Sequence, residues 1–200
     1  MRIKLELRST TALMMHSERL ANPQDPITKQ IAAFTSKKKN KTDADVAEIS
    51  RLEWYGGLYT DADGNIVIPS ANIAKSLRDA GTVTKSGKKI EQGLTPYALN
   101  VPLILPGNVR HQDKLWGKPE YIDKRLVKVG QARIVRARPI FSNWGVVAEF
   151  ELLEDVLNLD DFIAIAELAG RATGLGDARR IGYGRYTAKV AMAAVQAAAA

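Results

Sequence analysis

Regular alternation of charged and apolar residues opens the chain, and it constrains the fold more than any other feature. Residues 2–8 read Arg-Ile-Lys-Leu-Glu-Leu-Arg. Because successive side chains of a strand point to opposite faces, Ile3, Leu5 and Leu7 share one face of a half-buried strand. The chain must therefore build a sheet that is covered on one side.

Two helical patterns can supply that cover. In the first, Ile73 and Leu77 lie on one face of a helix that begins at the N-cap Ser70 and ends near Gly81. The second begins at Asn158 or Asp160, which can act as its N-cap. Its apolar residues follow the spacing i, i+3, i+4 and i+7 at Phe162, Ile165, Ala166 and Ala169.

Further strands follow from β-branched residues between Arg125 and Phe150, with a turn at Ser142-Asn143, and from residues 186–192. The order becomes strand, insertion, helix, insertion, strand hairpin, helix, strand. This order predicts an α+β fold of the ferredoxin-like (RRM-like) type, an antiparallel sheet with two helices and long insertions.

The length of 200 residues favours one domain, which we place at residues 1–195 with a tail at 196–200. Insertions fall at about 21–56 and 84–124. The first contains two short helical patterns, at 27–34 and 43–54, and the second has no sustained period, so we expect it to be irregular.

Composition narrows the function classes. The chain has no cysteine, so disulfides, thiolate zinc sites and cysteine nucleophiles are excluded. It has no apolar run long enough to span a bilayer and no signal-peptide pattern, so we expect a cytoplasmic protein without membrane contact. We find no metal site and no sign of a cofactor.

The excess of basic residues points to polyanions. Lys and Arg number 29 against 22 Asp and Glu, for a net charge of +7. Such an excess favours phosphate-bearing partners through counterion release. The run Lys37, Lys38 and Lys39 either follows a nucleic acid or keeps an exposed insertion solvated.

Glycine and arginine concentrate between Gly174 and Arg185, which reads Gly-Leu-Gly-Asp-Ala-Arg-Arg-Ile-Gly-Tyr-Gly-Arg. Glycines let a ligand approach the backbone, whose N–H groups can point at a phosphate, and a tyrosine ring can stack on a base. The same spacing also suits a tight loop that only closes a hairpin, and both interpretations stay open.

Three segments together resemble the CRISPR-associated RAMP superfamily of RNA-binding proteins with ferredoxin-like cores. Residues 174–185 are similar to its C-terminal glycine-rich loop. Residues 66–78 resemble its stretch from a strand through Ile-Pro into a helix ending in Leu-Arg, and residues 127–141 resemble the strands returning from its thumb hairpin. Two departures are Ser70-Ala71-Asn72 in place of a glycine-serine run and the negative charge of Asp177.

Within that superfamily the chain is most similar to the guide-RNA backbone subunit. The resemblance implies a thumb-like hairpin, guide RNA as ligand, copies of the chain along that RNA, and other subunits of an RNA-guided effector complex as partners. A solitary, virus-borne relative that mimics or inhibits such a complex fits equally. With the lysine run, the expected RNA-binding residues are His16, Ser17, Arg19, Lys37, Lys38, Lys39, Lys75, Arg78, Arg136, Arg138, Gly174, Gly176, Arg179, Arg180, Tyr183 and Arg185.

Two alternatives remain. Metal-independent RNA cleavage needs a base with a pKa near neutrality, and His16 follows the first strand near the expected RNA path, so a guide-RNA-processing endonuclease is one. The other is a basic protein–protein interaction module whose loops recognise an acidic protein.

Overall fold

β1 (Arg2–Ser9) is an interior strand of the main sheet. In the computed structural model, which describes residues 1–36, 41–129 and 132–193, it pairs antiparallel with β8 (Gly145–Leu152) on one side and with β9 (Tyr186–Met192) on the other. Ile3, Leu5 and Leu7 are fully buried. The alternation in the sequence therefore marks the covered face of this strand correctly.

Two short strands continue the sheet beyond β8. β4 (Leu94–Pro96) and β5 (Asn100–Ile104) pair with β8 one after the other along the same edge, and β5 pairs with β3 (Val67–Pro69). The sheet order is β3-β5-β8-β1-β9, and every pair is antiparallel.

The expectation that residues 84–124 are irregular is wrong. They contain α4 (Gly87–Gly93) as well as β4 and β5. Val101 and Leu103 alternate with exposed residues as a half-buried strand requires. The sequence did not predict these two strands because each contains a proline, Pro96 or Pro102, and a proline inside an apolar run argues against a strand.

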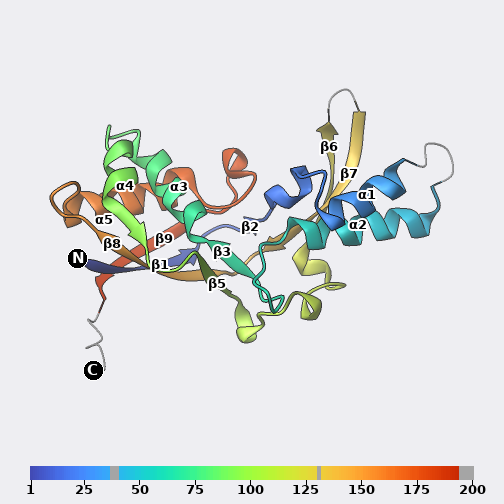
Figure 1. The fold of residues 1–200 in the computed structure, drawn as a ribbon, viewed down its shortest axis with the longest axis horizontal. Coiled ribbons are helices and arrows are strands. Elements are labelled where there is room, and N and C mark those ends of the chain that lie inside the picture. The colour runs from blue at the N-terminus through green and yellow to red at the C-terminus, as the bar shows by residue number, and fades with distance from the viewer. Residues whose placement is uncertain (37–40, 130–131, 194–200) are drawn as a thin grey trace.

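Helices α3 (Ser70–Gly81) and α5 (Leu159–Leu168) cover one face of the main sheet (Figure 1). The succession β1, α3, β4 with β5, β8, α5 and β9, in the spatial order found here, is that of a ferredoxin-like fold. The predicted fold class is therefore confirmed. Asn158 is the N-cap of α5 and accepts a hydrogen bond from the backbone N–H of Asp161 at 2.8 Å.

Ser70 does not cap α3. The N-cap position belongs to Pro69, and the Ser70 hydroxyl donates to the carbonyl of Ala98 at 2.6 Å. This hydrogen bond ties the start of α3 to the segment between β4 and β5, for which the sequence predicts no regular structure.

A second sheet projects from the first as an arm (Figure 1). β6 (Ile122–Val129) and β7 (Ala132–Phe141) form the expected thumb-like hairpin, and β2 (Leu13–Met14) pairs with the end of β7. β7 continues into β8 through the turn at Ser142-Asn143. The hairpin is therefore connected to the main sheet by a short turn.

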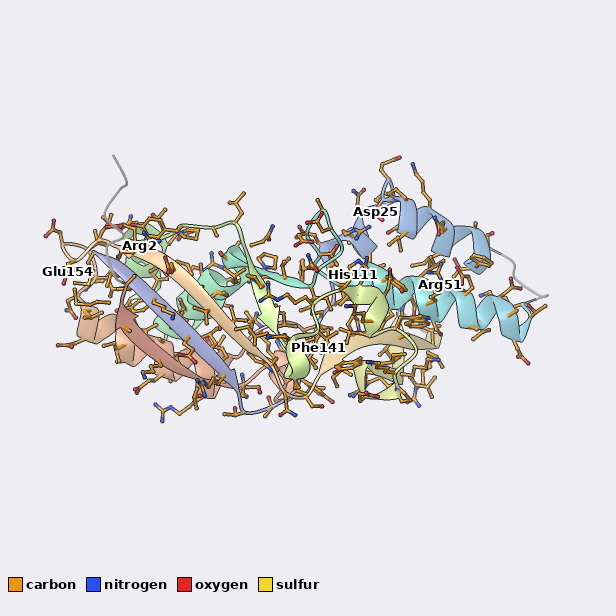
Figure 2. All side chains as sticks on the ribbon, turned by 90° about the horizontal axis from the view of Figure 1, so that it is seen from below. Arg2, Asp25, Arg51, His111, Phe141 and Glu154 are labelled. Carbon is orange, nitrogen blue, oxygen red and sulfur yellow. The ribbon has the colours of Figure 1, made fainter. Side chains whose placement is uncertain are left out.

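The two predicted insertion helices are confirmed as α1 (Pro26–Thr35) and α2 (Asp43–Gly57), which pack on each other. α2 also packs along β7. Glu53 of α2 accepts a hydrogen bond from the backbone N–H of Ala137 at 2.9 Å. In Figure 2, Arg2 and Glu154 lie at the main-sheet end, and Asp25 and Arg51 lie at the helical end.

Short turns complete the chain, and within the described ranges no helix has both the length and the apolar character needed to cross a bilayer. The turns are η1 (Glu18–Ala21), η2 (Pro106–Asn108), η3 (Gln112–Lys114), η4 (Pro119–Tyr121), the π-helical η5 (Ala169–Thr173) and η6 (Arg179–Ile181).

Candidate nucleic-acid interface

Two hollows meet at His16, where the body joins the hairpin. The first, of about 170 Å³, lies between α3 and the glycine-rich loop, and the second, of about 380 Å³, lies between α1, η1 and the hairpin. The first is lined by His16, Tyr59, Asn72, Lys75, Gly176, Asp177 and Arg179. The second adds Leu20, Ala21, Thr28, Ile31, Ala32, Thr35, Glu53, Val127, Arg136, Ala137 and Arg138.

Six of the predicted residues lie in these hollows although they are far apart in the sequence. β1 ends in a bend that leads through β2 to His16, α3 carries Lys75, and β7 carries the two arginines. The six are His16, Lys75, Arg136, Arg138, Gly176 and Arg179.

Basic side chains outnumber acidic ones along the two hollows. Four cations line them, Lys75, Arg136, Arg138 and Arg179, against the two carboxylates Glu53 and Asp177. A hollow with an excess of positive charge concentrates polyanions.

The arginines are held in place by carboxylates. Arg138 lies 3.2 Å from Asp177, and Arg136 pairs with Glu53, which is only 4% exposed. Arg179 pairs with Asp79 at 3.3 Å. These pairs fix the orientation of the guanidinium groups and reduce the free charge that sequence reading assigned to them.

Lys75 differs from the arginines. It is exposed on α3, and no ion pair forms on it within the part of the chain that the structure describes. Its full charge therefore faces the first hollow.

His16 stands between the two hollows. Desolvation of the imidazole is the main cause that lowers its pKa. The charges of Arg138 and Arg136 lower the pKa further, while those of Asp177 and Glu53 raise it. The imidazole is consequently neutral at neutral pH. It can then accept a proton or a hydrogen bond, but it adds no charge to the interface.

The glycine-rich loop is packed at its two ends. A Cβ on Gly184 would lie 1.8 Å from the carbonyl oxygen of Leu175, and one on Gly176 would lie 2.4 Å from that of Met14. Both glycines have positive φ, at +70° and +79°. They are required for close packing against the chain itself, which is the tight-loop interpretation.

Many backbone N–H groups of this loop are already engaged. Leu175 donates to Gly184, Asp177 to Met14 and Gly184 to Ala12, at 2.7–2.8 Å. At these three positions the backbone N–H groups are therefore not free to bind a phosphate, and the phosphate-binding interpretation is wrong for them. The turn η6 at the loop tip, with the exposed Arg180, remains open to solvent.

The side chain of Arg185 contacts the loop itself, whereas that of Tyr183 contacts strand β6 of the hairpin. Nη2 of Arg185 donates to the carbonyl of Arg179 at 3.1 Å, so this side chain closes the loop. The hydroxyl of Tyr183 accepts a hydrogen bond from Arg125 at 2.8 Å, and the guanidinium of Arg125 lies 5.4 Å from its ring centre. One face of the ring is thus already covered by a cation.

The remaining predicted residues lie outside the hollows. Ser17 is 2% exposed and caps η1, Arg19 pairs with Asp25 at 3.0 Å, and Arg78 lies near Asp79 and Glu91. Gly174 is buried at the base of the loop. Lys37, Lys38 and Lys39 lie outside the described residues.

Glu53 is the important residue that sequence reasoning missed. It shares a helix face with Ser50 and Gly57, both buried, so a carboxylate stands where α2 packs on β7. The sequence could have indicated it, because a charged residue on a helix face that is otherwise packed needs an ionic or hydrogen-bonding partner. Tyr59 and Asn72 were missed as well.

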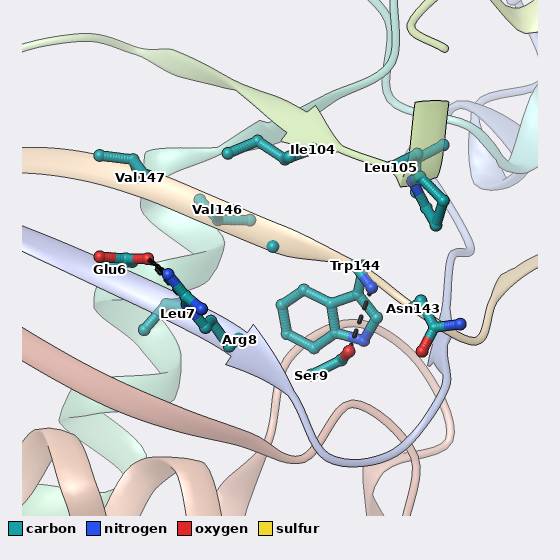
Figure 3. A pocket seen from close by; sticks show the side chains of 12 residues that line it. Glu6, Leu7, Arg8, Ser9, Ile104, Leu105, Asn143, Trp144, Val146 and Val147 are labelled. Carbon is teal, nitrogen blue, oxygen red and sulfur yellow. Dashed lines mark hydrogen bonds and ion pairs between the residues drawn. The ribbon is translucent and has the colours of Figure 1, made fainter. Parts of the chain in front are cut away.

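A larger hollow lies on the helix-free face of the main sheet (Figure 3). It measures about 490 Å³ and lies beside Trp144, Ile104 and Val147. Arg8 at its rim pairs with Glu6 at 2.6 Å. None of the predicted RNA-binding residues lines it, and its lining is mainly apolar.

No protein-family model matches the chain, and no curated protein does. One similar solved structure is described as "Cryo-EM structure of the Type III-B Cmr-beta bound to cognate target RNA". The identity is 11% and the TM-score 0.49, over 96% of this chain and 61% of the other, so the chain spans less than two thirds of that protein's length. The ferredoxin-like assignment rests on the strand order and does not depend on this likeness.

Proposed function

We propose that this chain is a RAMP-type, non-catalytic subunit that binds guide RNA through its phosphate backbone along the two hollows joined at His16. The observation that carries the proposal is the excess of four cations over two carboxylates in the linings of two hollows that share His16. The resemblance of three sequence segments to the RAMP superfamily supports the same assignment.

In this function Lys75 and the loop tip near Arg180 neutralise phosphates. Contacts to phosphate and sugar carry little sequence information and release counterions, so binding is largely independent of sequence and falls steeply with salt. Copies of the chain associate along one RNA beside the other subunits of an RNA-guided complex. A virus-borne mimic or inhibitor of such a complex would use the same surface.

Salt titration tests this function directly. Anisotropy of a labelled single-stranded RNA gives the affinity of the wild type, of Lys75→Ala/Arg180→Ala and of Lys4→Ala/Lys189→Ala. The second double variant removes two exposed lysines from the helix-free face of the main sheet. Removing one cation that neutralises a phosphate should reduce the slope of log affinity against log salt by about 0.7.

We therefore expect the first double variant to lose about 1.4 from the slope and the control to keep the wild-type slope. Equal losses in both variants would mean diffuse attraction by net charge and would reject the site. Sequencing the nucleic acid that accompanies the purified protein then identifies the RNA. A monomer free of nucleic acid would favour the basic protein-interaction module.

Endonuclease activity is a second candidate because the lowered pKa of His16 leaves a neutral imidazole beside Tyr59 and Lys75. Incubation with labelled repeat RNA in the absence of metal measures cleavage. If the wild type cuts and His16→Ala does not, the enzyme function gains support. Equal cutting by both proteins would remove His16 from any catalytic role.

A further inference from the structure

Strand β9 forms an open edge of the main sheet. It lies at the end of the strand order β3-β5-β8-β1-β9, and among the described residues it pairs with β1 alone. The strand at the opposite end, β3, has three residues and ends in Pro69. β9 has seven residues and no proline, so it lacks the shortness and the proline that protect β3 from pairing with another chain.

The backbone of β9 directs hydrogen-bonding groups outward at alternate residues. Ala193, directly after the strand, donates to the carbonyl of Arg2 at 3.1 Å, and hydrogen-bonded pairs alternate with non-bonded pairs along antiparallel strands. Odd-numbered residues of β9 therefore bond to β1, and even-numbered residues point their N–H and C=O groups away from it. Beyond Tyr186, these outward residues are Ala188, Val190 and Met192. Their backbone groups have no backbone partner within the described part of the chain.

The helical side of the sheet limits where this edge is open. At the start of β9, η5 packs so closely that a Cβ on Gly170 would lie 2.1 Å from the carbonyl oxygen of Tyr186. A strand added along the edge would therefore meet free backbone groups from Ala188 onward.

The side chains of the outward residues lie on the helix-covered face of the sheet. They stand opposite the buried residues of β1, and residues directly opposite each other in an antiparallel pair share a face. Ala188 and Val190 are partly buried against the core, whereas Met192 is 69% exposed. A hollow of about 410 Å³ lies at the other end of the strand, beside Tyr186 and Ala188. One strand thus carries an exposed apolar side chain at one end and a hollow at the other.

We propose that β9 pairs with β9 of a second copy of this chain in an antiparallel, two-fold symmetric dimer. Val190 then faces Val190 of the partner subunit, and Ala188 faces the partner's Met192, so each methionine enters the hollow of the other copy. These are hydrogen-bonded pairs, in which the two residues exchange both backbone bonds. Because a two-fold pair closes on itself, this contact is separate from association along RNA and does not depend on the proposed RNA-binding function.

The charge of Lys189 favours this register over its neighbours. Lys189 is exposed on the helix-free face of the sheet, and in the proposed dimer it lies opposite Ala191 of the partner subunit. Moving the partner by two residues in one direction would bring the two Lys189 side chains directly opposite each other, which is unfavourable. Moving it by two residues in the other direction would take Met192 away from the hollow.

Sedimentation velocity of protein freed from RNA by nuclease treatment measures the dimer over a range of concentrations. One strand pair is a small interface, so we expect a reversible dimer that grows with concentration. Val190→Pro removes an outward N–H that the fold does not use, and proline is tolerated at such an edge position. It should weaken the dimer at least about tenfold through the loss of two hydrogen bonds. Val190→Thr keeps the N–H and the β-branched shape, so it should retain the dimer within about threefold.

Ala191→Glu tests the register. Its carboxylate would face Lys189 of the partner subunit at two symmetric places, so the dimer should tighten about fivefold. Ala33→Glu makes the same change of charge at an exposed position on α1, in the arm, and should leave the dissociation constant unchanged.

A cross-link tests the geometry without relying on the proline variant. The chain has no cysteine, so Val190→Cys gives each copy a single thiol. In the proposed pair the two Cα atoms lie about 5.5 Å apart, within reach of a disulfide. Mild oxidation should join the copies, whereas Val83→Cys, at a position that is 74% exposed, should stay largely monomeric.

Three outcomes would overturn the proposal. A wild type that stays monomeric at every concentration would leave the edge to a strand of another protein. A dimer that Val190→Pro and Ala191→Glu leave unchanged would place the contact elsewhere, as would equal cross-linking of Val190→Cys and Val83→Cys. None of these results would affect the salt titration that tests RNA binding.

Discussion

The helix-free face of the main sheet and the interface at His16 are both rich in arginine, yet they differ in how that charge is held. On the sheet face Arg2 pairs with Glu149 and Arg8 pairs with Glu6, and Arg8 is 77% exposed. At the interface Arg136 is anchored by Glu53, a carboxylate that is 4% exposed.

This difference shows that the number of arginines does not mark a binding surface. Pairs exposed to solvent contribute little energy and can rearrange freely. A pair with a buried member fixes its guanidinium before any ligand arrives, and at the interface cations also remain in excess. The interface therefore has preorganised donors that the sheet face lacks.

The largest expected effect concerns stability. Glu53→Ala removes the buried partner of both Arg136 and the backbone N–H of Ala137, so we expect the free energy of unfolding to fall by about 3 kcal/mol. Glu149→Ala, which breaks the exposed pair with Arg2, should cost less than about 1 kcal/mol. Urea denaturation of the two variants measures both values, and equal losses would erase the distinction between the surfaces.

A smaller effect concerns affinity. Lys75→Glu places a repulsive charge in the first hollow and should weaken RNA binding about tenfold, as expected for the loss of one hydrogen bond between charged groups. Lys4→Glu makes the same charge change on the sheet face and should alter the affinity by less than about twofold. Anisotropy titration at low salt compares them, and a similar loss in both would place the RNA elsewhere.

The smallest effect concerns pH. Because the pKa of His16 is lowered, this residue takes up a proton only as the pH falls below the ordinary histidine range. The positive form attracts phosphate, so affinity should rise about threefold as the pH is lowered through that pKa. His16→Gln should remove the rise and His111→Gln should keep it. A rise that survives in His16→Gln would assign the titration to another group.

Local patterns were sufficient for much of the fold. Alternation identified β1, apolar spacing identified α3 and α5, and β-branched residues identified strands between Arg125 and Phe150. The short strands β4 and β5 escaped detection because each contains a proline and depends on pairing with β8. A strand of three or five residues is stabilised mainly by its neighbours, and the neighbours are not visible in a local window.

The candidate site was only partly accessible from the sequence. Basic residues in the segments that resemble the RAMP superfamily led to the prediction of Lys75, Arg138 and Arg179 as RNA-binding cations, and all three line the hollows. The same reasoning assigned Gly176 to a ligand, whereas this glycine allows the loop to pack against the carbonyl oxygen of Met14. Glycine spacing cannot distinguish these two causes, because either one requires the absence of a side chain.

The amino-acid sequence by itself determined the kind of sheet, the two helices that cover it and the basic character of the chain, since these depend on periodicity and composition. Only the tertiary structure decided which cations remain free, because Glu53 and Asp177 come from elements far from the arginines they bind. Ion pairing depends on distances in space, and for residues separated by about 80 or 40 positions those distances follow from packing alone.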